Sequence, residues 1–519
     1  MKGLKKARTM NACNFIFPPP QKCILGKTAA NISRELRLNV EKVPEESLQA
    51  LYQILKRRRL RVSNDSGTML RCEITGNVFR DIKNESIRKQ AYLLEITEDG
   101  RIILQAADIA GIKYGIITLS EIFAAAAKGA LINACMITDF PAFAVRGVQI
   151  DMAREFFPSL PYLKKIVDRL EKMKANTLWL YIENRFQAKG MKDIAPAYGM
   201  TAAIAGEISE YALARGIDVV PGINVLSHME GWFRLQRYSE FCDGDSRSYP
   251  VLTKPEPLKL VFQYIDSMIE AFPSKNFHAG LDELLFTETN PEAAEAIKKL
   301  GKADYFANFA IKVIKHIQKK GKTVWMWDDM VLGKNIYRKE GFNDTYRQAL
   351  DKIPDDVIMT HWYYWTNADG KHTDIIKRVT ESGRPFVVAP SSLGQRSDYT
   401  AFDKTLELQA YIAECGFKYG AFGFINTHWE SRKGHFFESL WPHLAVSSAF
   451  AWYGPEAGNT VFFAESFSFN LTGDTGNTLM KYLEKMSMID SFLDNHGIGN
   501  GKLRYDLYCR GPHFLWRFC

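Results

Sequence analysis

The sequence lacks the features that mark several large classes of protein. It has no apolar run of about 18 residues, so a membrane-spanning helix is not predicted. Its first 25 residues contain no apolar stretch of the roughly 7–15 residues found in a secretory signal. No basic stretch is interleaved with aromatic residues, as single-stranded nucleic acid would require. We therefore expect a cytoplasmic protein without a membrane span and without a nucleic-acid partner.

Metal-type cysteine spacing and a strong charge of one sign are also absent. The eight cysteines are scattered along the chain, which indicates reduced thiols rather than a metal site, although a disulfide involving Cys509 or Cys519 stays open. The 67 basic and 59 acidic residues leave a formal charge of +8, which is mild over 519 residues. With 46% hydrophobic residues, the composition is that of a globular enzyme of two or three domains.

What the sequence does contain is a repeated pattern of a short apolar strand followed by an amphipathic helix. Leu163, Ile166, Val167 and Leu170, for example, recur at helical spacing. Eight such units over about 300 residues predict a (β/α)8 TIM barrel. A doubly wound open sheet is the alternative, but no glycine-rich phosphate loop follows the first strand. The predicted barrel strands are 146–151, 177–183, 218–225, 276–282, 323–328, 357–362, 385–389 and 421–427.

We divide the chain into three parts on this pattern. Residues 1–138 are predicted to form a small N-terminal α/β accessory domain, in which 92–96 and 102–106 are strands on either side of an Asp99-Gly100 turn. Residues 139–455 form the barrel, which opens after the break at Asp139-Phe140-Pro141. Residues 456–519 form a C-terminal helical extension, with one helix predicted over 475–495.

The fourth predicted barrel strand ends on two adjacent carboxylates, Asp282 and Glu283. The carboxyl ends of the strands carry the active site in such barrels. Two neighbouring carboxylates repel each other when both are ionised, so one of them tends to have a raised pKa, which suits a general acid. An exposed acidic loop or a helix N-terminus is the alternative interpretation.

The segment His278-Ala279-Gly280-Leu281-Asp282-Glu283 matches the pattern His-x-Gly-x-Asp-Glu. It resembles the signature of glycoside hydrolase family 20, the β-N-acetylhexosaminidases. The resemblance extends over roughly residues 90–455, and the Trp-Tyr-Tyr after the sixth strand points to the smaller, intracellular-type branch. It implies removal of terminal non-reducing N-acetylglucosamine or N-acetylgalactosamine from a glycan or glycoconjugate, with no metal and no organic cofactor.

The resemblance also assigns roles to individual residues. Glu283 is expected to be the general acid and base, and Asp282 to hold the substrate's acetamido group. Arg146 is the first residue of an Arg-Gly-x-x-x-Asp-x-x-Arg segment that the family shares, and it would bind sugar hydroxyls, with a salt bridge inside the barrel floor as its alternative. His228 would lie beside Glu283. Tyr399, with Tyr364 as its rival, would bind the acetamido oxygen. The complete set of expected substrate-binding residues is Arg146, His228, His278, Trp327, Asp328, Trp362, Tyr364, Tyr399, Trp429 and Glu430.

The sequence departs from the family at the end of the second strand. Asn184 stands where the family has an aspartate that pairs with the histidine of strand three. Either that relay is weakened or Glu183 replaces the aspartate. The departure leaves a catalytically weak or inactive sugar-binding protein of the same fold as an alternative function.

Adjacent carboxylates constrain the mechanism. An ordinary retaining glycosidase needs two carboxyl groups about 5 Å apart that flank the sugar. Residues 282 and 283 are neighbours on one strand and cannot do so. Substrate-assisted catalysis, in which the 2-acetamido oxygen attacks the anomeric carbon, removes the conflict. Another barrel glycosidase that uses the acetamido group is a further alternative, but its carboxylates would be spaced differently.

Overall fold

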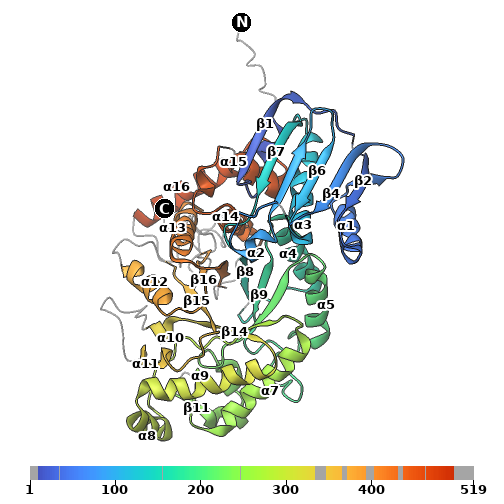
Figure 1. The fold of residues 1–519 in the computed structure, drawn as a ribbon. Coiled ribbons are helices and arrows are strands. Elements are labelled where there is room, and N and C mark those ends of the chain that lie inside the picture. The colour runs from blue at the N-terminus through green and yellow to red at the C-terminus, as the bar shows by residue number, and fades with distance from the viewer. Residues whose placement is uncertain are drawn as a thin grey trace.

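The computed structural model describes residues 10–495 except 34, 77, 155, 246, 333–346, 365–370, 393–401, 430–436 and 462. Two bodies are visible in Figure 1, an N-terminal sheet drawn in blue and a barrel below it. The element labels below are those of that figure.

The N-terminal domain is built on a seven-stranded mixed sheet. Residues in β5 (Tyr92–Ile96) and β6 (Ile102–Ala106) are alternately fully buried and partly exposed, as strands with one face on a core require. The long helix α3 (Ile109–Ala126) packs on β4, β5 and β6, and α1 (Glu45–Arg57) packs on α3. The strand order is β1 (Lys22–Ala29), β7 (Asn133–Asp139), β5 (Tyr92–Ile96), β6 (Ile102–Ala106), β4 (Thr68–Ile74), β2 (Glu35–Glu41) and β3 (Arg61–Ser63).

Helix α3 is long and apolar enough, by length and composition alone, to cross a membrane. In the structure 61% of its residues are buried inside the protein. The helix packs closely on its neighbours at Gly111, where an added Cβ would lie only 2.2 Å from the carbonyl oxygen of Ala91. It is the core helix of the N-terminal domain.

Eight parallel strands close into a barrel, which confirms the predicted TIM-barrel fold. The open-sheet alternative is wrong, because the last strand pairs with the first over six residues, from Gly423 opposite Val145 to His428 opposite Ile150. The barrel strands are β8 (Val145–Asp151), β9 (Thr177–Tyr181), β10 (Asp218–Gly222), β13 (Asn276–His278), β14 (Thr323–Trp327), β15 (Ile358–Trp362), β16 (Phe386–Ala389) and β17 (Gly423–His428).

Helices surround the barrel, and α4 contains Leu163, Ile166, Val167 and Leu170, the residues that recur at helical spacing in the sequence. The described helices of this part are α4 (Leu160–Lys172), α5 (Ala202–Leu213), α6 (Glu230–Phe233), α7 (Pro255–Ala271), α8 (Pro291–Leu300), α9 (Lys302–Lys319), α10 (Asp329–Leu332), α11 (Arg347–Leu350), α12 (Lys371–Glu381), α13 (Phe402–Tyr419) and α14 (Trp441–Tyr453). Two more helices follow, α15 (Phe463–Thr472) and α16 (Thr478–Asn495), of which the sequence predicted only the second.

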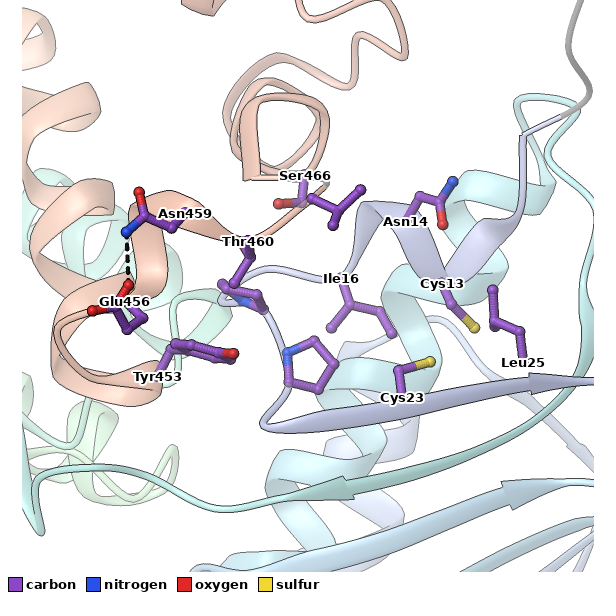
Figure 2. A pocket seen from close by; sticks show the side chains of 13 residues that line it. Cys13, Asn14, Ile16, Cys23, Leu25, Tyr453, Glu456, Asn459, Thr460 and Ser466 are labelled. Carbon is purple, nitrogen blue, oxygen red and sulfur yellow. Dashed lines mark hydrogen bonds between the residues drawn. The ribbon is translucent and has the colours of Figure 1, made fainter.

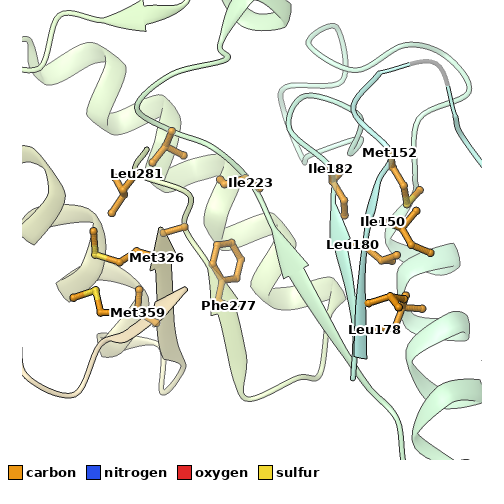
Figure 3. Close-up of a cluster of buried hydrophobic side chains, with 14 of the residues drawn as sticks. Ile150, Met152, Leu178, Leu180, Ile182, Ile223, Phe277, Leu281, Met326 and Met359 are labelled. Atoms are coloured by element: carbon orange, nitrogen blue, oxygen red, sulfur yellow. The ribbon is translucent and has the colours of Figure 1, made fainter. Parts of the chain in front are cut away.

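The barrel strands divide their side chains between two environments. Leu178 and Leu180 of β9 belong to a large core cluster (Figure 3). The α4 residues Leu163 and Ile166 belong to the same cluster. Trp179 and Tyr181 alternate with them and belong to a separate, mainly aromatic cluster. Since successive side chains of a strand point to opposite faces, the second cluster fills the barrel interior. It also contains Trp325, Trp327, Trp362, Val220, Val387, Ala389 and Ile425.

Arg146 lies at the interface between the barrel and the N-terminal domain, so its predicted contact with the sugar is wrong. It is the second residue of β8, at the opposite end of the strand from the expected pocket. Its guanidinium donates to carbonyl oxygens of Phe143, Ala144 and Lys174 and to side chains of the N-terminal domain, and it is 2% exposed. The alternative, a salt bridge inside the barrel floor, places the residue correctly, but the hydrogen-bond partners of its guanidinium are neutral oxygen atoms rather than a carboxylate.

Candidate active site

The chain turns sharply after β13 and brings Asp282 and Glu283 to the carboxyl end of the barrel. Gly280 has a φ of 72°, and a Cβ there would lie 2.6 Å from the carbonyl oxygen of Ile223. A glycine is therefore required at this position, both for the left-handed conformation and for the close approach to β10. Strand β13 ends at His278, earlier than the predicted limit of 282. The backbone after it leaves the extended conformation, since Gly280 and Leu281 both have positive φ values.

Asp282 is buried and held by residues that follow β10. The side-chain amide of Asn224 donates to Oδ1 of Asp282 at 2.6 Å, and Ser227 Oγ donates to its carbonyl oxygen at 2.8 Å. Burial, followed by the nearby charges of Asp329 and Glu283, raises the pKa of Asp282 well above its usual range. The hydrogen bond from Asn224 fixes one carboxyl oxygen of Asp282. Because the ionised carboxylate is disfavoured at this buried position, a positive charge placed beside it would stabilise it.

Glu283 lies beside His228, as predicted. Nε2 of His228 is 3.1 Å from Oε2 of Glu283, and the two side chains are 28% and 24% exposed. Burial alone would lower the pKa of His228, but the hydrogen bond to Glu283 and the charges of Glu183, Asp282 and Glu283 raise it to about 9. The backbone N–H of Glu283 donates to Asp329 Oδ2 at 3.0 Å. Glu283 is thus the more exposed of the two carboxylates and is hydrogen-bonded at both its backbone and its side chain.

Three polar residues of this site adopt a backbone conformation that ordinary residues avoid. Glu183, His228 and Glu283 have φ values of 47°, 54° and 51°. Such conformations cost about 1–3 kcal/mol each and persist where the surrounding structure enforces them. Their coincidence at three different strand ends indicates that the positions of these side chains are functionally important.

Glu183, rather than Asn184, is the residue of the second strand end that influences His228. Asn184 donates its side-chain amide to the carbonyl oxygen of Ile194 at 3.1 Å and is in close contact with Gly231. Burial raises the pKa of the Glu183 carboxyl, while Arg154 and His228 oppose that shift. The charge of Glu183 in turn contributes to the raised pKa of His228.

Aromatic rings form one wall beside the carboxylates. The Trp429 ring centroid lies 5.0 Å from that of Tyr181 and 5.9 Å from that of Trp327, and its indole N–H donates to Tyr364 OH at 2.7 Å. Trp362 in turn lies 4.9 Å from Tyr364. The structure therefore brings together four of the predicted aromatic residues, of which Trp327 and Trp362 are themselves buried, at 1% and 6% exposure. Tyr399 and Glu430 lie outside the described residues.

Two predicted substrate contacts are corrected by the structure. His278 has no exposed surface: its Nδ1 accepts from Gly280 N–H, its Nε2 is 3.2 Å from Thr360 Oγ1, and its ring stacks on Trp179 at 4.0 Å. Asp328 is also fully buried, with Oδ2 2.5 Å from Nδ1 of His361. Both residues support the strand ends from within the protein and do not line the pocket.

Arg154 is the functional candidate that sequence reasoning missed. Its guanidinium pairs with Asp151 at 2.6 Å, lies 4.0 Å from Glu183 and sits 5.5 Å from the Trp429 ring. It therefore lies at the carboxyl end of β8, beside the aromatic wall. The signal was available, because Arg146 and Arg154 both belong to the Arg-Gly-x-x-x-Asp-x-x-Arg segment, and only the second follows the strand.

His228, Asp282 and Glu283 also have ligand atoms within 4.8 Å of one another, a spacing that a metal ion could use. A metal-bound histidine must offer a free lone pair from neutral imidazole. His228, with its pKa raised to about 9, carries a proton at neutral pH. The arrangement is thus better suited to proton transfer than to metal binding.

A closed parallel barrel with paired carboxylates beside aromatic rings is an arrangement typical of glycoside hydrolases. Two family models agree with this assignment: residues 143–394 match the catalytic domain of glycosyl hydrolase family 20, and residues 14–140 match domain 2 of the same family. The chain belongs to glycoside hydrolase family 20, which confirms the resemblance seen in the sequence.

Individual relatives are distant. The chain is 27% identical over 310 residues to a β-hexosaminidase of Akkermansia muciniphila, covering 51% of this chain and 61% of the relative. It is 25% identical over 328 residues to the human β-hexosaminidase subunit beta, covering 58% and 54%. It is 24% identical over 295 residues to a lacto-N-biosidase of Bifidobacterium bifidum, covering 54% and 25%. The chain thus matches between a quarter and three-fifths of the length of these relatives.

Solved structures share the fold over most of the chain. The family 20 β-N-acetylhexosaminidase of Streptomyces coelicolor has a TM-score of 0.65 at 18% identity, covering 89% of this chain and 97% of that one. The β-N-acetylhexosaminidase of Bacteroides fragilis has a TM-score of 0.64 at 17% identity, covering 95% and 98%. At these identities the likeness establishes the arrangement of both domains.

Proposed function

We propose that this protein is an exo-β-N-acetylhexosaminidase that uses substrate-assisted, retaining hydrolysis. The observation that carries the proposal is the different setting of two adjacent carboxyl groups. Asp282 is buried and fixed by Asn224, whereas Glu283 is partly exposed and bonded to a protonated histidine. Neighbours on one strand end cannot flank a sugar ring as nucleophile and acid, so the nucleophile comes from the substrate.

The first step follows from this geometry. Glu283 donates a proton to the leaving glycosidic oxygen while the 2-acetamido oxygen of the sugar attacks the anomeric carbon. Asp282 accepts a hydrogen bond from the acetamido N–H, which gains positive charge as the oxazolinium-like intermediate forms. Its other oxygen is held by Asn224, so the carboxylate need not reorganise during the step. In the second step Glu283 takes a proton from the attacking water.

The neighbouring residues adjust the electrostatics of both steps. The raised pKa of Asp282 reflects a buried carboxylate without a full counter-charge. A positive charge develops on the substrate as the transition state forms, and it supplies that counter-charge. The interaction with Asp282 is therefore stronger in the transition state than with the bound substrate, and such a difference raises the rate of the chemical step. The rings of Trp327, Trp429 and Tyr364 limit water at this point, and a lower local dielectric strengthens the interaction.

The relatives support the same substrate class. Proteins named β-hexosaminidase occur among the matches from a bacterium and a mammal. We infer that the substrate is a glycan or glycoconjugate with a terminal β-linked N-acetylhexosamine. A catalytically inactive sugar-binding protein is disfavoured, because Asp282, Glu283 and His228 retain a connected geometry.

A panel of nitrophenyl glycosides tests the proposal. Nitrophenyl β-N-acetylglucosaminide and β-N-acetylgalactosaminide should be hydrolysed with retention at the anomeric carbon, and the β-glucoside, which lacks the acetamido group, should not. Equal rates on the β-glucoside would refute substrate assistance. Binding of N-acetylglucosamine without any hydrolysis would instead support the sugar-binding alternative.

A further inference from the structure

Three cysteines from distant parts of the sequence meet beside the first strand of the N-terminal domain. Cys13 lies in the short helix η1 (Ala12–Phe15), Cys23 in β1 and Cys135 in β7. The sulfur atoms of Cys13 and Cys135 are 3.7 Å apart. In the ladder Cys23 pairs with Ile137 and Leu25 with Cys135, so Cys23 and Cys135 lie on the same face of adjacent strands. Cys13 covers that face and contacts both.

Cys13 and Cys23 border a cavity of about 500 Å³ that lies apart from the candidate active site. Figure 2 shows Cys13 and Cys23 with their sulfur atoms turned toward the same space. On the opposite side lie residues from the end of α14, from η6 (Ala457–Asn459) and from the start of α15, so the cavity lies between the N-terminal domain and the C-terminal helices. Its lining includes Asn14, Pro20, Tyr453, Glu456, Asn459 and Ser466.

The thiols differ in exposure and in acidity. Cys23 is exposed, whereas Cys13 and Cys135 are buried. A hydrogen bond with Cys13 lowers the pKa of Cys23, against the opposing effects of partial desolvation by neighbouring atoms and of the Asp139 charge. Hydrogen bonds with Cys135 and with Cys23 raise the pKa of Cys13. The accessible thiol is therefore the one that more readily becomes a thiolate, the nucleophilic form.

We propose that Cys23 and Cys13 form a dithiol site that reacts with small disulfide molecules entering this cavity. The Cys23 thiolate attacks one sulfur of the disulfide RS–SR, forming Cys23–S–SR and releasing RS⁻. The Cys13 thiol gives its proton to that thiolate and attacks the Cys23 sulfur, which forms the Cys13–Cys23 disulfide and releases the second RS⁻. Two cysteine thiols are oxidised and one small disulfide is reduced to two thiols.

The lining of the cavity indicates the preferred charge of the molecule. Among the described residues that line it, Glu456 is the charged one. Its carboxylate accepts from Asn459 Nδ2 at 2.7 Å, which orients it within the same lining. A cationic disulfide such as cystamine should therefore react faster than anionic oxidised glutathione.

The reaction can be followed on the full-length protein by peptide-mapping mass spectrometry after incubation with cystamine or oxidised glutathione. We expect Cys23 to be modified first, at least roughly tenfold faster than the half-buried Cys242, and the wild-type product to be a Cys13–Cys23 disulfide without an adduct. Cystamine should act faster than oxidised glutathione, and Glu456→Gln should reduce that difference.

Serine variants separate the roles of the thiols. Cys13→Ser should stop the reaction at a stable mixed disulfide on Cys23, and Cys23→Ser should abolish it. Cys135→Ser, the matched control, should still form the Cys13–Cys23 disulfide. The proposal is overturned if wild-type Cys23 reacts no faster than Cys242, or if the wild-type protein retains the adduct as Cys13→Ser does. The wild-type measurement decides this even where a variant folds poorly.

Discussion

Nε2 of His228 lies 3.1 Å from Oε2 of Glu283, and both side chains are about one-quarter exposed, whereas the adjacent Asp282 is buried. This pair joins two strand ends that are separated by 55 residues in sequence. It gives two neighbouring carboxyl groups different surroundings and therefore different tasks.

Replacing the general acid should remove most of the activity. Glu283→Gln keeps the size of the side chain but cannot donate a proton, so kcat/KM on a nitrophenyl β-N-acetylglucosaminide should fall by roughly 10²–10⁴. Glu295→Gln, on the exposed side of α8, is the control and should leave the rate unchanged. A rate for Glu283→Gln within a factor of two of wild type would exclude this residue as the acid.

Asp282→Asn should lower activity and raise stability together. The amide cannot stabilise the positive charge of the intermediate, so kcat should fall by roughly tenfold or more. Because burial and two nearby carboxylates raise the pKa of Asp282, its ionised form destabilises the folded protein at neutral pH. Thermal unfolding should therefore show a higher Tm for the variant at pH 7, by an amount that shrinks as the pH falls. A lower Tm at pH 7 would contradict this account.

The raised pKa of His228 predicts a loss of stability at alkaline pH. A histidine with a folded-state pKa of about 9 contributes stability that is complete below its ordinary pKa of about 6.5 and is lost as the pH rises through 9. Between these values the free energy of unfolding should fall more in wild type than in His228→Gln, by on the order of 2 kcal/mol. His316→Gln, at the surface pair with Asp266, serves as the control in denaturant titrations.

Arg154 and Arg146 should show opposite defects. Arg154→Met removes a charged donor beside the sugar pocket, so kcat/KM should fall roughly 10–100-fold, the equivalent of about 1.5–3 kcal/mol. Arg146→Met removes the donors to several buried carbonyls and should lower the free energy of unfolding by about 3 kcal/mol while KM stays unchanged. If Arg146→Met raised KM and left stability intact, the corrected assignment would fail.

Gly280→Ala tests the close approach behind Asp282. An added Cβ would lie 2.6 Å from the carbonyl oxygen of Ile223, on a backbone with φ of 72°. We expect a loss of about 1–3 kcal/mol of stability and a marked loss of activity, because Asp282 would move away from Asn224. Gly321→Ala is a matched control: its φ is 74°, but no atom lies within 4 Å of the added Cβ. It should lose some stability and keep full activity.

The strand pattern in the sequence predicted where several residues of the candidate site lie, whereas their roles came from the resemblance to the family. The pattern placed Asp282, Glu283, His228, Trp327 and Trp429 at strand ends, and the carboxyl ends of parallel strands meet at one face of a closed barrel. Arg146 was misplaced because its motif was read without asking at which end of the strand it lies. His278 and Asp328 were assigned to the pocket by the resemblance to the family, and neither a motif nor a pattern of alternation says how deep in the barrel a residue lies.

The sequence by itself determined the eight strands, their helices and the pair of carboxylates, since hydrophobic period and local composition record which residues face a core. Tertiary structure alone decided that Glu183 rather than Asn184 acts on His228, and that Asp282 is buried while Glu283 is accessible. Those outcomes depend on left-handed backbone turns and on contacts between residues tens of positions apart. These contacts form only when the barrel has closed, so a local pattern in the sequence cannot predict them.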